Sequence, residues 1–432
     1  MSLYEIFKKH DAVSTDTRQI GQNSIFFALK GDKFDGNQYA DEAISKGAAF
    51  AVIDNAAYKK DERYLLVDDV LTALQDLAEE HRRHLTHLKL IAVVGSNGKT
   101  ITKELIYKVL NTKYKTFGTE KNWNNHIGVP LNILKLNDKH EFAVIEMGAN
   151  HLGEHLTLCR IAQPNYGIIT NCGKDHLEGY GSIEGVIQSN KELFDYLRSV
   201  GGTCFVNAND AILMQISEGL KRFFYQWNST NREAITGEIL NKFPFVTVQV
   251  HANTHYGLDK FVINSHLFGS FQLNNILAVT TIGTFFGIDA HLIKSAIEQY
   301  VPENNRSQLM KWNENTVLLD AYNANPSSVL PMIEDFMEFE MENKIVILGD
   351  MFELGEHTDI EHRGVVERMK NHNFKEVILV GKFFGKHKGI IEATFFDNSE
   401  QVKAYLSDKQ YKGCYFLAKG SRGMKIESSF GT

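Results

Sequence analysis

A buried strand, a glycine turn and a helix follow one another between residues 88 and 110, and this order restricts the fold more than any other stretch. The apolar run LKLIAVV is followed by GSNGKT and then by ITKELIYKVL, whose apolar residues recur at helical spacing. Such a unit is typical of the phosphate loop of an open α/β sheet. The full P-loop form has an earlier glycine where this chain has Val93. We therefore predict an α/β protein built around a short variant of that loop.

The residues of this loop predict a site for ATP and Mg²⁺. Gly95 and Gly98 permit a tight turn whose N–H groups converge on phosphate oxygens, and the helix N-terminus favours an anion. Lys99 is expected to reach the terminal phosphates, and the Thr100 hydroxyl is expected to bind Mg²⁺. The alternative is a glycine-rich turn with a solvated lysine. The ATP-binding residues predicted in this segment are Gly95, Ser96, Asn97, Gly98, Lys99, Thr100 and Thr102.

Strand-like runs alternate with helical stretches throughout the 432 residues, which indicates α/β architecture in two or three domains. We predict domains at 1–85, 86–301 and 302–432, with the phosphate loop in the middle one. In the last domain the runs TVLLDAY, KIVILGD, EVILVG and CYFLAKG predict a parallel, Rossmann-like sheet.

Composition and charge exclude several classes of protein. With 43% hydrophobic and 23% charged residues the chain reads as globular, and its net charge of −7 gives no reason to expect a nucleic-acid surface. No apolar run approaches the roughly 20 residues that span a bilayer. The first residues, MSLYEIFKKHDAV, carry charges where a signal peptide is apolar. We expect a cytoplasmic monomer that binds small molecules, with no membrane span and no nucleic-acid partner.

The cysteines and one histidine cluster predict no metal site. The histidines of HRRHLTHL are expected on a solvated helix face, because no acidic or cysteine partner accompanies them. No cysteine pair has CxxC spacing, so the thiols are expected to be reduced and buried. These residues are His81, His84, His87, Cys159, Cys172, Cys204 and Cys414.

Three polar residues form a second candidate cation site. Glu146 ends the strand of FAVIEMGA, where open α/β sheets place ligand-binding residues. His176 follows another strand end within TNCGKDHLEGYGS, and Lys191 lies in the helical stretch QSNKELF. Taken singly, they read as a solvated acid, a loop histidine and a surface lysine, whereas the set together favours a site. A phosphate loop alone fits kinases, GTPases and motor ATPases as well as ligases.

These motifs resemble those of the Mur ligases, a family that adds amino acids to the peptidoglycan precursor. The resemblance covers essentially the full length, and its central pattern is GSNGKTITKE, EMGANHLGE and ITNCGKDHLEGYGSIEGVIQSNKELF. It implies a UDP-binding α/β domain, a central ATPase domain with a mainly parallel sheet and a Rossmann-like C-terminal domain. It also implies that Glu146 and His176 hold magnesium, and that Lys191 joins them as a carbamate. A carbamate is an anion and can bind the cation, whereas the ammonium of an unmodified lysine would repel it.

The stretch LLDAYNANPSS, from Leu318 to Ser328, resembles the signature of those family members that join D-alanyl-D-alanine to a UDP-N-acetylmuramoyl tripeptide. The resemblance implies these two substrates and an acyl-phosphate intermediate. Asp320 is implied at the ATP ribose or the reacting centre, and Arg306 at the phosphates. Tyr322, Asn323 and Asn325 are expected to bind substrate at the junction of the central and C-terminal domains, although an ordinary Asn-Pro turn is the alternative. The implied catalytic residues are Lys99, Lys191, His176, Arg306 and Asp320.

Weaker stretches complete the resemblance. Asn275 keeps the last position of the family's adenine motif, while Phe271 and Gln272 replace the usual pair. STDTRQI resembles a uridine diphosphate turn, with a polar N-cap turn as the alternative, and TEKNWNNHIGVP resembles a substrate-facing loop. The implied substrate-binding residues there are Thr15, Asp16, Thr17, Arg18, Asn124 and Asn125. Two rival functions stay open: a folate polyglutamate synthase-like amide ligase, and a nucleotide-binding regulator without catalysis.

Overall fold

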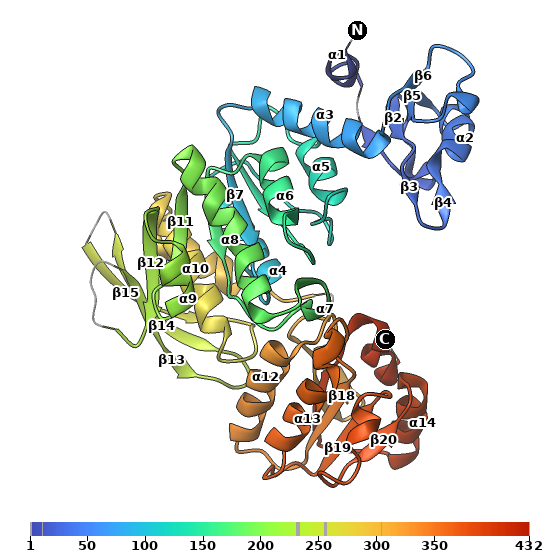
Figure 1. Ribbon diagram of the computed structural model, residues 1–432. Helices are drawn as coiled ribbons and strands as arrows, with labels where there is room; N and C mark the ends of the chain where they lie inside the picture. The colour runs from blue at the N-terminus through green and yellow to red at the C-terminus, as the bar shows by residue number, and fades with distance from the viewer. Residues whose placement is uncertain (1, 11, 230–233, 255–256, 304, 432) are drawn as a thin grey trace.

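The computed structural model describes residues 2–10, 12–229, 234–254, 257–303 and 305–431. Within these residues, three sheets of four or more strands follow one another along the chain, from the blue end to the red end in Figure 1. Their strands are mainly parallel and helices cover them, so the predicted α/β architecture in three parts is confirmed. The predicted boundaries after residues 85 and 301 stay predictions.

The first sheet is parallel, with the order β1-β2-β5-β6 in the described residues. The long helix α3 (Val70–His84), capped by Asp69, leads from it to the central sheet (Figure 1). One apolar core continues from this sheet through α3 into the central part. The elements of the first part are α1 (Leu3–Phe7), β1 (Val13–Ser14), β2 (Ser24–Phe27), β3 (Lys30–Gly31), β4 (Phe34–Asp35), α2 (Ala40–Ser45), β5 (Ala48–Ile53) and β6 (Tyr64–Leu66).

The histidine-rich end of α3 corrects one expectation. His84 and His87 are exposed, but His81 is buried. Its ring meets Phe7 of α1 edge-on, with 5.0 Å between the ring centroids, and its Nε2 lies 2.9 Å from the Leu136 carbonyl oxygen. The predicted solvated face is wrong for His81, because α1 and the segment after α5 cover this side of the helix.

The central sheet has the order β15-β14-β13-β12-β11-β10-β7-β9-β8 in the described residues, and it is parallel except at one edge, where β14 pairs antiparallel with both β13 and β15. The predicted strands correspond to β7, β9 and β10. The strands are β7 (Lys89–Val94), β8 (Thr116–Gly118), β9 (Phe142–Glu146), β10 (Tyr166–Ile169), β11 (Thr203–Asn207), β12 (Lys221–Trp227), β13 (Ile235–Asn241), β14 (Thr247–Thr254) and β15 (Gly257–Asn264).

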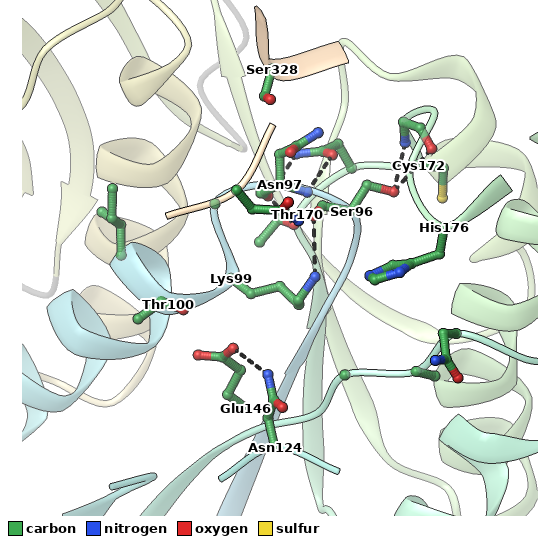
Figure 2. A pocket seen from close by; sticks show the side chains of 18 of the residues that line it. Ser96, Asn97, Lys99, Thr100, Asn124, Glu146, Thr170, Cys172, His176 and Ser328 are labelled. Carbon is green, nitrogen blue, oxygen red and sulfur yellow. Dashed lines mark hydrogen bonds between the residues drawn. The ribbon is translucent and has the colours of Figure 1, made fainter. Parts of the chain in front are cut away.

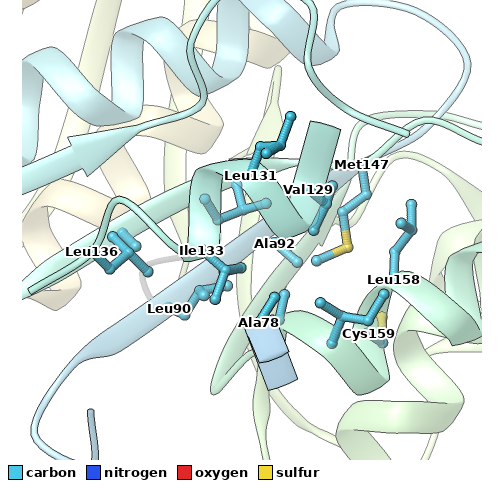
Figure 3. Packing of buried hydrophobic residues seen from close by; sticks show 14 of the residues in the cluster. Ala78, Leu90, Ala92, Val129, Leu131, Ile133, Leu136, Met147, Leu158 and Cys159 are labelled. Atoms are coloured by element: carbon cyan, nitrogen blue, oxygen red, sulfur yellow. The ribbon is translucent and has the colours of Figure 1, made fainter. Parts of the chain in front are cut away.

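Helices cover both faces of this sheet, which explains the continuous apolar run of β7. Leu90 and Ala92 point into the core under α3, α5, α6 and α8, whereas Ile91 and Val93 point into the core under α4, α10 and α11. Figure 3 shows the first of these cores around Ala92. The helices are α4 (Lys99–Leu110), α5 (Gly128–Ile133), α6 (Glu154–Ala162), α7 (Leu177–Tyr180), α8 (Ile183–Val200), α9 (Ala211–Ile216), α10 (Gln272–Phe285) and α11 (Ala290–Glu298).

The C-terminal sheet has the order β16-β17-β21-β18-β19-β20, and only the β16–β17 pair is antiparallel among the described strands. Its elements are β16 (Gln308–Trp312), β17 (Asn315–Asp320), α12 (Pro326–Glu338), β18 (Lys344–Gly349), α13 (Thr358–Arg368), β19 (Glu376–Val380), β20 (Thr394–Phe396), α14 (Ser399–Lys409) and β21 (Tyr415–Lys419). Among the helices of the described residues, none is long and apolar enough to cross a membrane.

The C-terminal part packs directly against the central part. One apolar cluster joins Leu177 and Tyr180 of α7 to Met351 and Leu354, which follow β18. The same junction contains polar contacts of Lys174 with α12 and α13, and of His176 with Glu353 in the loop after β18. The loops at the carboxyl ends of the two sheets therefore meet, and this meeting point positions the candidate site.

Candidate active site

A cavity of about 1130 Å³ lies where the three parts meet. Leu71 and Gln75 of α3 line one end, the phosphate loop lines the middle, and Arg306 and Tyr322 line the C-terminal side. Ligand pockets usually measure roughly 300–1,000 Å³, so this cavity has room for a nucleotide together with a second ligand. All three predicted parts of the chain thus contribute to one site.

The phosphate loop has the backbone that the sequence predicts. Gly95 has φ +127° and Gly98 has φ +81°, both in the left-handed region. A Cβ atom on Gly95 would lie 2.2 Å from Thr170 Oγ1, so only glycine fits there. The loop then enters α4, whose buried face contains Ile101, Leu105, Ile106 and Val109 as predicted.

The segment after β10 holds this loop in shape. Asn97 N–H donates to Asn171 Oδ1 at 3.1 Å, and Thr170 Oγ1 donates to the Asn97 carbonyl at 2.7 Å. Ser96 Oγ donates to Asp175 Oδ1 at 2.5 Å. No sequence motif predicted Thr170, Asn171 and Asp175 as parts of the site. Their signal was their place directly after a parallel strand, the same edge at which β7 delivers the phosphate loop.

Lys99 is the first residue of α4, and its side chain turns back over the loop. Its ammonium donates to the Ser96 carbonyl at 3.1 Å and also to the Gly95 carbonyl. Figure 2 shows Lys99, Glu146 and His176 pointing into the same space, and all three line the cavity. The ammonium therefore stands beside the backbone N–H groups that a phosphate would meet.

Glu146 leaves an unsatisfied oxygen at the cavity. The residue is 2% exposed, and its Oε1 accepts from Asn124 Nδ2 at 2.8 Å. Its Oε2 is buried without a hydrogen-bond partner in the structure. A buried carboxylate oxygen left without a partner is costly, so this atom fits a cation ligand.

The other side chains near Glu146 fit a Mg²⁺ ion that is bound partly by the phosphates of a substrate. His176 lines the cavity, and Thr100 follows Lys99 in its wall. No group of three or more His, Cys, Asp or Glu residues that could hold a metal occurs in the described part of the chain. Mg²⁺ is usually bound by one or two carboxylates together with phosphates and water, and not by an all-protein cage. The donor set of Thr100, Glu146 and His176 therefore fits the ion.

Lys191 is not among the residues that line the cavity. It lies on α8, where its ammonium donates to the two carboxylate oxygens of Asp195 at 2.6 and 2.8 Å. Arg198 donates to the same carboxylate at 2.5 Å. The structure thus brings Glu146 and His176 to one cavity and leaves Lys191 in a separate ion pair, and the carbamate stays a prediction.

The C-terminal side of the cavity carries three further charged groups. The Arg306 guanidinium lies over the Tyr322 ring, with its Cζ 3.6 Å from the ring centroid. Asp320, the last residue of β17, accepts from Ser307 N–H at 2.9 Å and pairs with Lys419 at the end of β21. Lys419 is a site residue that the sequence analysis missed, although its position at a strand end is the same signal that identified Asp320.

One amide pair joins the phosphate loop to the C-terminal part. Asn325 Nδ2 donates to Asn97 Oδ1 at 2.9 Å. Asn325 is also the N-cap of α12, and its Oδ1 accepts from Ser328 N–H at 2.9 Å. The YNANP stretch therefore lies at the domain junction, as its resemblance implied, and it contacts the phosphate loop directly.

Asn275, which the sequence predicts to contact adenine, already forms hydrogen bonds within the protein. Asn275 lines the cavity beside Gln272, to which its Nδ2 donates at 2.7 Å, and its Oδ1 accepts from Thr102 at 3.1 Å. Thr102 is fully buried beneath it. Asn207, which ends β11, and Asp210, the N-cap of α9, also line the cavity and were not predicted.

The predicted uridine turn lies on the first part of the chain. Arg18 donates to the Asp16 carboxylate at 2.8 Å, and hydrogen bonds from Arg18 lower the pKa of Asp16 to about 2.

The cavity wall contains many of the residues that the sequence predicts for the site. Those in the wall are Ser96, Asn97, Gly98, Lys99, Thr100, Asn124, Asn125, Glu146, His176, Asn275, Arg306, Asp320, Tyr322 and Asn323. Those outside the wall are Thr15, Asp16, Thr17, Arg18, Gly95, Thr102, Lys191 and Asn325.

The cysteines are free, and Cys159, Cys204 and Cys414 are buried as expected. Cys172 is only partly buried, which corrects the expectation for that residue, because it belongs to the cavity wall. Burial nevertheless raises the pKa of the Cys172 thiol to about 12, so it stays protonated near neutral pH.

Known proteins resemble this chain over nearly its full length. The family model of the Mur ligase middle domain matches residues 93–283, the glutamate ligase domain of Mur ligases matches 305–418, and the catalytic domain of the Mur ligase family matches 9–82. A UDP-N-acetylmuramoyl-tripeptide–D-alanyl-D-alanine ligase of Bacillus subtilis (strain 168) is 31% identical, and the match covers 96% of this chain and 91% of the relative. The chain belongs to the Mur ligase family.

Solved structures show that the family fold extends over the whole chain. The MurF ligase of Thermotoga maritima, in complex with ADP, superimposes with a TM-score of 0.85 at 23% identity and covers 100% of this Mur ligase and 98% of its own chain. A folylpolyglutamate synthase of the same organism has a TM-score of 0.60 at 10% identity and covers 84% of this chain and 93% of its own. The fold is shared with both, and the agreement is closer for the former.

Proposed function

We propose that this Mur ligase joins D-alanyl-D-alanine to a UDP-N-acetylmuramoyl tripeptide at the expense of ATP. The observation that carries the proposal is the single cavity in which a phosphate loop, an unsatisfied carboxylate oxygen and the YNANP stretch come together. The relative in Bacillus subtilis, matched over 96% of this chain, carries this activity in its name. The sequence signature and the cavity therefore support the same reaction.

ATP is assigned to the phosphate loop. Ser96, Asn97 and Gly98 face the phosphates from the cavity wall, and Lys99 neutralises their charge. Thr100, Glu146 and His176 would hold Mg²⁺, which offsets the repulsion between the phosphates and an approaching carboxylate. Lys191 as a carbamate would extend that set from α8 after leaving Asp195. Asn275 and the buried Thr102 support the base region, and Asp320 is assigned to the ribose or the reacting centre.

The reaction follows from where the charges lie. The tripeptide carboxylate attacks the γ-phosphorus, which gives an acyl phosphate and ADP. The amine of D-alanyl-D-alanine then attacks the acyl carbon, an amide forms and inorganic phosphate leaves. Lys99 and Arg306 both line the cavity around this centre, and the Tyr322 ring packs against the Arg306 guanidinium. Catalysis of this kind is mostly positioning and charge neutralisation.

The uridine nucleotide is assigned to the first part of the chain. Thr15, Asp16, Thr17 and Arg18 would hold its uracil and diphosphate groups. The peptide would run along α3 toward Asn124 and Asn125, since Leu71, Gln75 and these asparagines all line the cavity. Asn124 already contacts Glu146, so the peptide end would arrive beside the cation site.

An omission assay tests the proposal. ADP release is measured with ATP, a UDP-muramoyl tripeptide and D-alanyl-D-alanine, and each is left out in turn. Full turnover is expected only with all three present, with either diaminopimelate or lysine as the third residue of the tripeptide. Equal ADP release with a folate and glutamate, or release that ignores both acceptor substrates, would overturn the assignment.

A further inference from the structure

Glu353 belongs to the C-terminal part, yet it contacts the candidate metal ligand of the central part. It lies four residues after β18, and its Oε2 is 2.7 Å from His176 Nδ1. Glu178 N–H donates to the Glu353 carbonyl at 3.0 Å, which fixes the backbone of the acid against α7. Both His176 (φ +46°) and Glu353 (φ +62°) have left-handed backbones. Two residues with uncommon backbones thus meet across the domain junction.

The contact determines which nitrogen of His176 is free. A carboxylate at Nδ1 places the ring proton on that atom, so Nε2 keeps its lone pair. The ring lines the cavity in which Glu146 Oε2 lies without a partner. Histidines that bind metals almost always donate their other ring N–H to a carboxylate, a carbonyl or water, and loss of that partner weakens metal binding roughly 10–100-fold.

We propose that Glu353 is a positioning residue, which completes the cation site of Glu146 and His176 only when the C-terminal domain is docked. The inference rests on the proposed function for the identity of the cation. Its consequence is a coupling between domain docking and the capacity to activate a carboxylate. An acyl phosphate would then form only inside a closed cavity, where water cannot hydrolyse it.

A neighbouring ion pair provides a control that distinguishes the positioning of His176 from a contact that only holds the two domains together. Lys174 and Glu361 form another ion pair across the same junction, with 2.5 Å between Nζ and Oε1. This pair does not include His176, so Glu361→Gln removes an ion pair between the domains and leaves the imidazole as it is. It is the matched control for Glu353, whose side chain is about half exposed and can be replaced without opening the core.

The experiment uses Mn²⁺ as the probe on the full-length protein with ADP and no other substrate. Electron spin-echo spectroscopy reports the ¹⁴N coupling of an imidazole bound to Mn²⁺, and a titration gives the Mn²⁺ concentration at half-maximal coupling. The coupling is expected in the unmodified protein and absent in His176→Asn. Glu353→Ala should raise the half-maximal concentration about tenfold. Glu353→Gln, whose amide oxygen still accepts from Nδ1–H, should restore most of the affinity, and Glu361→Gln should stay within twofold of the unmodified protein.

Three results would overturn the proposal. The first is unchanged Mn²⁺ affinity in Glu353→Ala, and the second is an equal loss in Glu361→Gln, which would reduce Glu353 to a docking contact. The third is the absence of imidazole coupling in the unmodified protein. Neither the muramoyl substrate nor the dipeptide is present, so a wrong choice of those substrates appears only in the omission assay and leaves this readout intact.

Discussion

At the scale of single residues, Lys99 carries the largest expected effect on turnover. Among the described residues its ammonium donates to two loop carbonyls, so Lys99→Ala removes little from the fold, about 1 kcal/mol. The loss of its charge at the phosphates should lower ADP formation about 1,000-fold. Steady-state ADP release and a thermal melt measure the two effects. Lys108→Ala, on the exposed side of the same helix, is the matched control and should leave both unchanged. Near-normal turnover in Lys99→Ala would contradict the phosphate assignment.

The buried His155 is expected to make the free energy of unfolding depend on pH. The residue is fully buried on α6, its Nδ1 lies 3.0 Å from the Ser189 carbonyl, and burial lowers its pKa from 6.5 to about 4. The unfolded chain therefore binds a proton between pH 6.5 and 4 that the folded protein does not, and stability falls as the pH drops through this range. At pH 4.5 the loss amounts to about 2 kcal/mol relative to pH 7.

The variant His155→Asn isolates this contribution. Its free energy of unfolding in urea should fall less than that of the unmodified protein between pH 7 and pH 4.5, by about 2 kcal/mol. The other buried histidines, such as His81 and His362, contribute equally to both proteins and cancel in the difference. Parallel pH profiles for the two proteins would show that His155 is not the buried neutral group described here.

At the scale of elements, the start of α12 serves both stability and nucleotide binding. Asn325→Asp keeps a good N-cap, because Asp and Asn cap helices almost equally well. It removes the amide donor to Asn97 and places a carboxylate beside the phosphate loop. The melting temperature should stay within about 2 °C of the unmodified protein. The KM for ATP should rise about tenfold, which corresponds to about 1.4 kcal/mol of repulsion.

Asn325→Ala provides the contrast, since it loses the cap and should cost about 1 kcal/mol of stability. Melting curves and ATP titrations of both variants measure these effects. An Asp variant that melts normally and also binds ATP normally would show that the residue is only a cap.

The elements also show which parts of the fold could be predicted. β7 is buried on both faces, so its continuous apolar run identifies it, and α4 follows from its helical spacing. In contrast, β12 reads KRFFYQW and has only Tyr225 fully buried, so polar and apolar residues mix and the strand escapes a search for apolar runs. The prediction that His81 is solvated was wrong for a related reason. Its surroundings come from α1 and from the segment after α5, which lie far from it in sequence.

At the scale of the whole molecule, a site residue could be predicted only where the sequence immediately around it has a recognisable pattern. The phosphate loop, Glu146 and Asp320 follow strand ends, and parallel sheets gather such ends at one edge. The partners of these residues come from elsewhere: Lys419 lies 99 residues from Asp320, and Asn325 lies 228 residues from Asn97. The pairing of β17 with β21 brings Asp320 and Lys419 together, and the docking of the C-terminal part brings Asn325 to Asn97. Local sequence patterns therefore indicate the site but not its cross-domain contacts.

We infer that this cavity activates a carboxylate by phosphorylating it, and the fate of the carboxylate oxygen tests this inference. The tripeptide substrate is prepared with ¹⁸O in its terminal carboxylate and is turned over with ATP and D-alanyl-D-alanine. Mass spectrometry of the released phosphate should show one ¹⁸O atom per turnover, because the attacking carboxylate oxygen leaves with phosphorus when the amine displaces it. Phosphate without ¹⁸O, formed alongside the amide product, would contradict the claim.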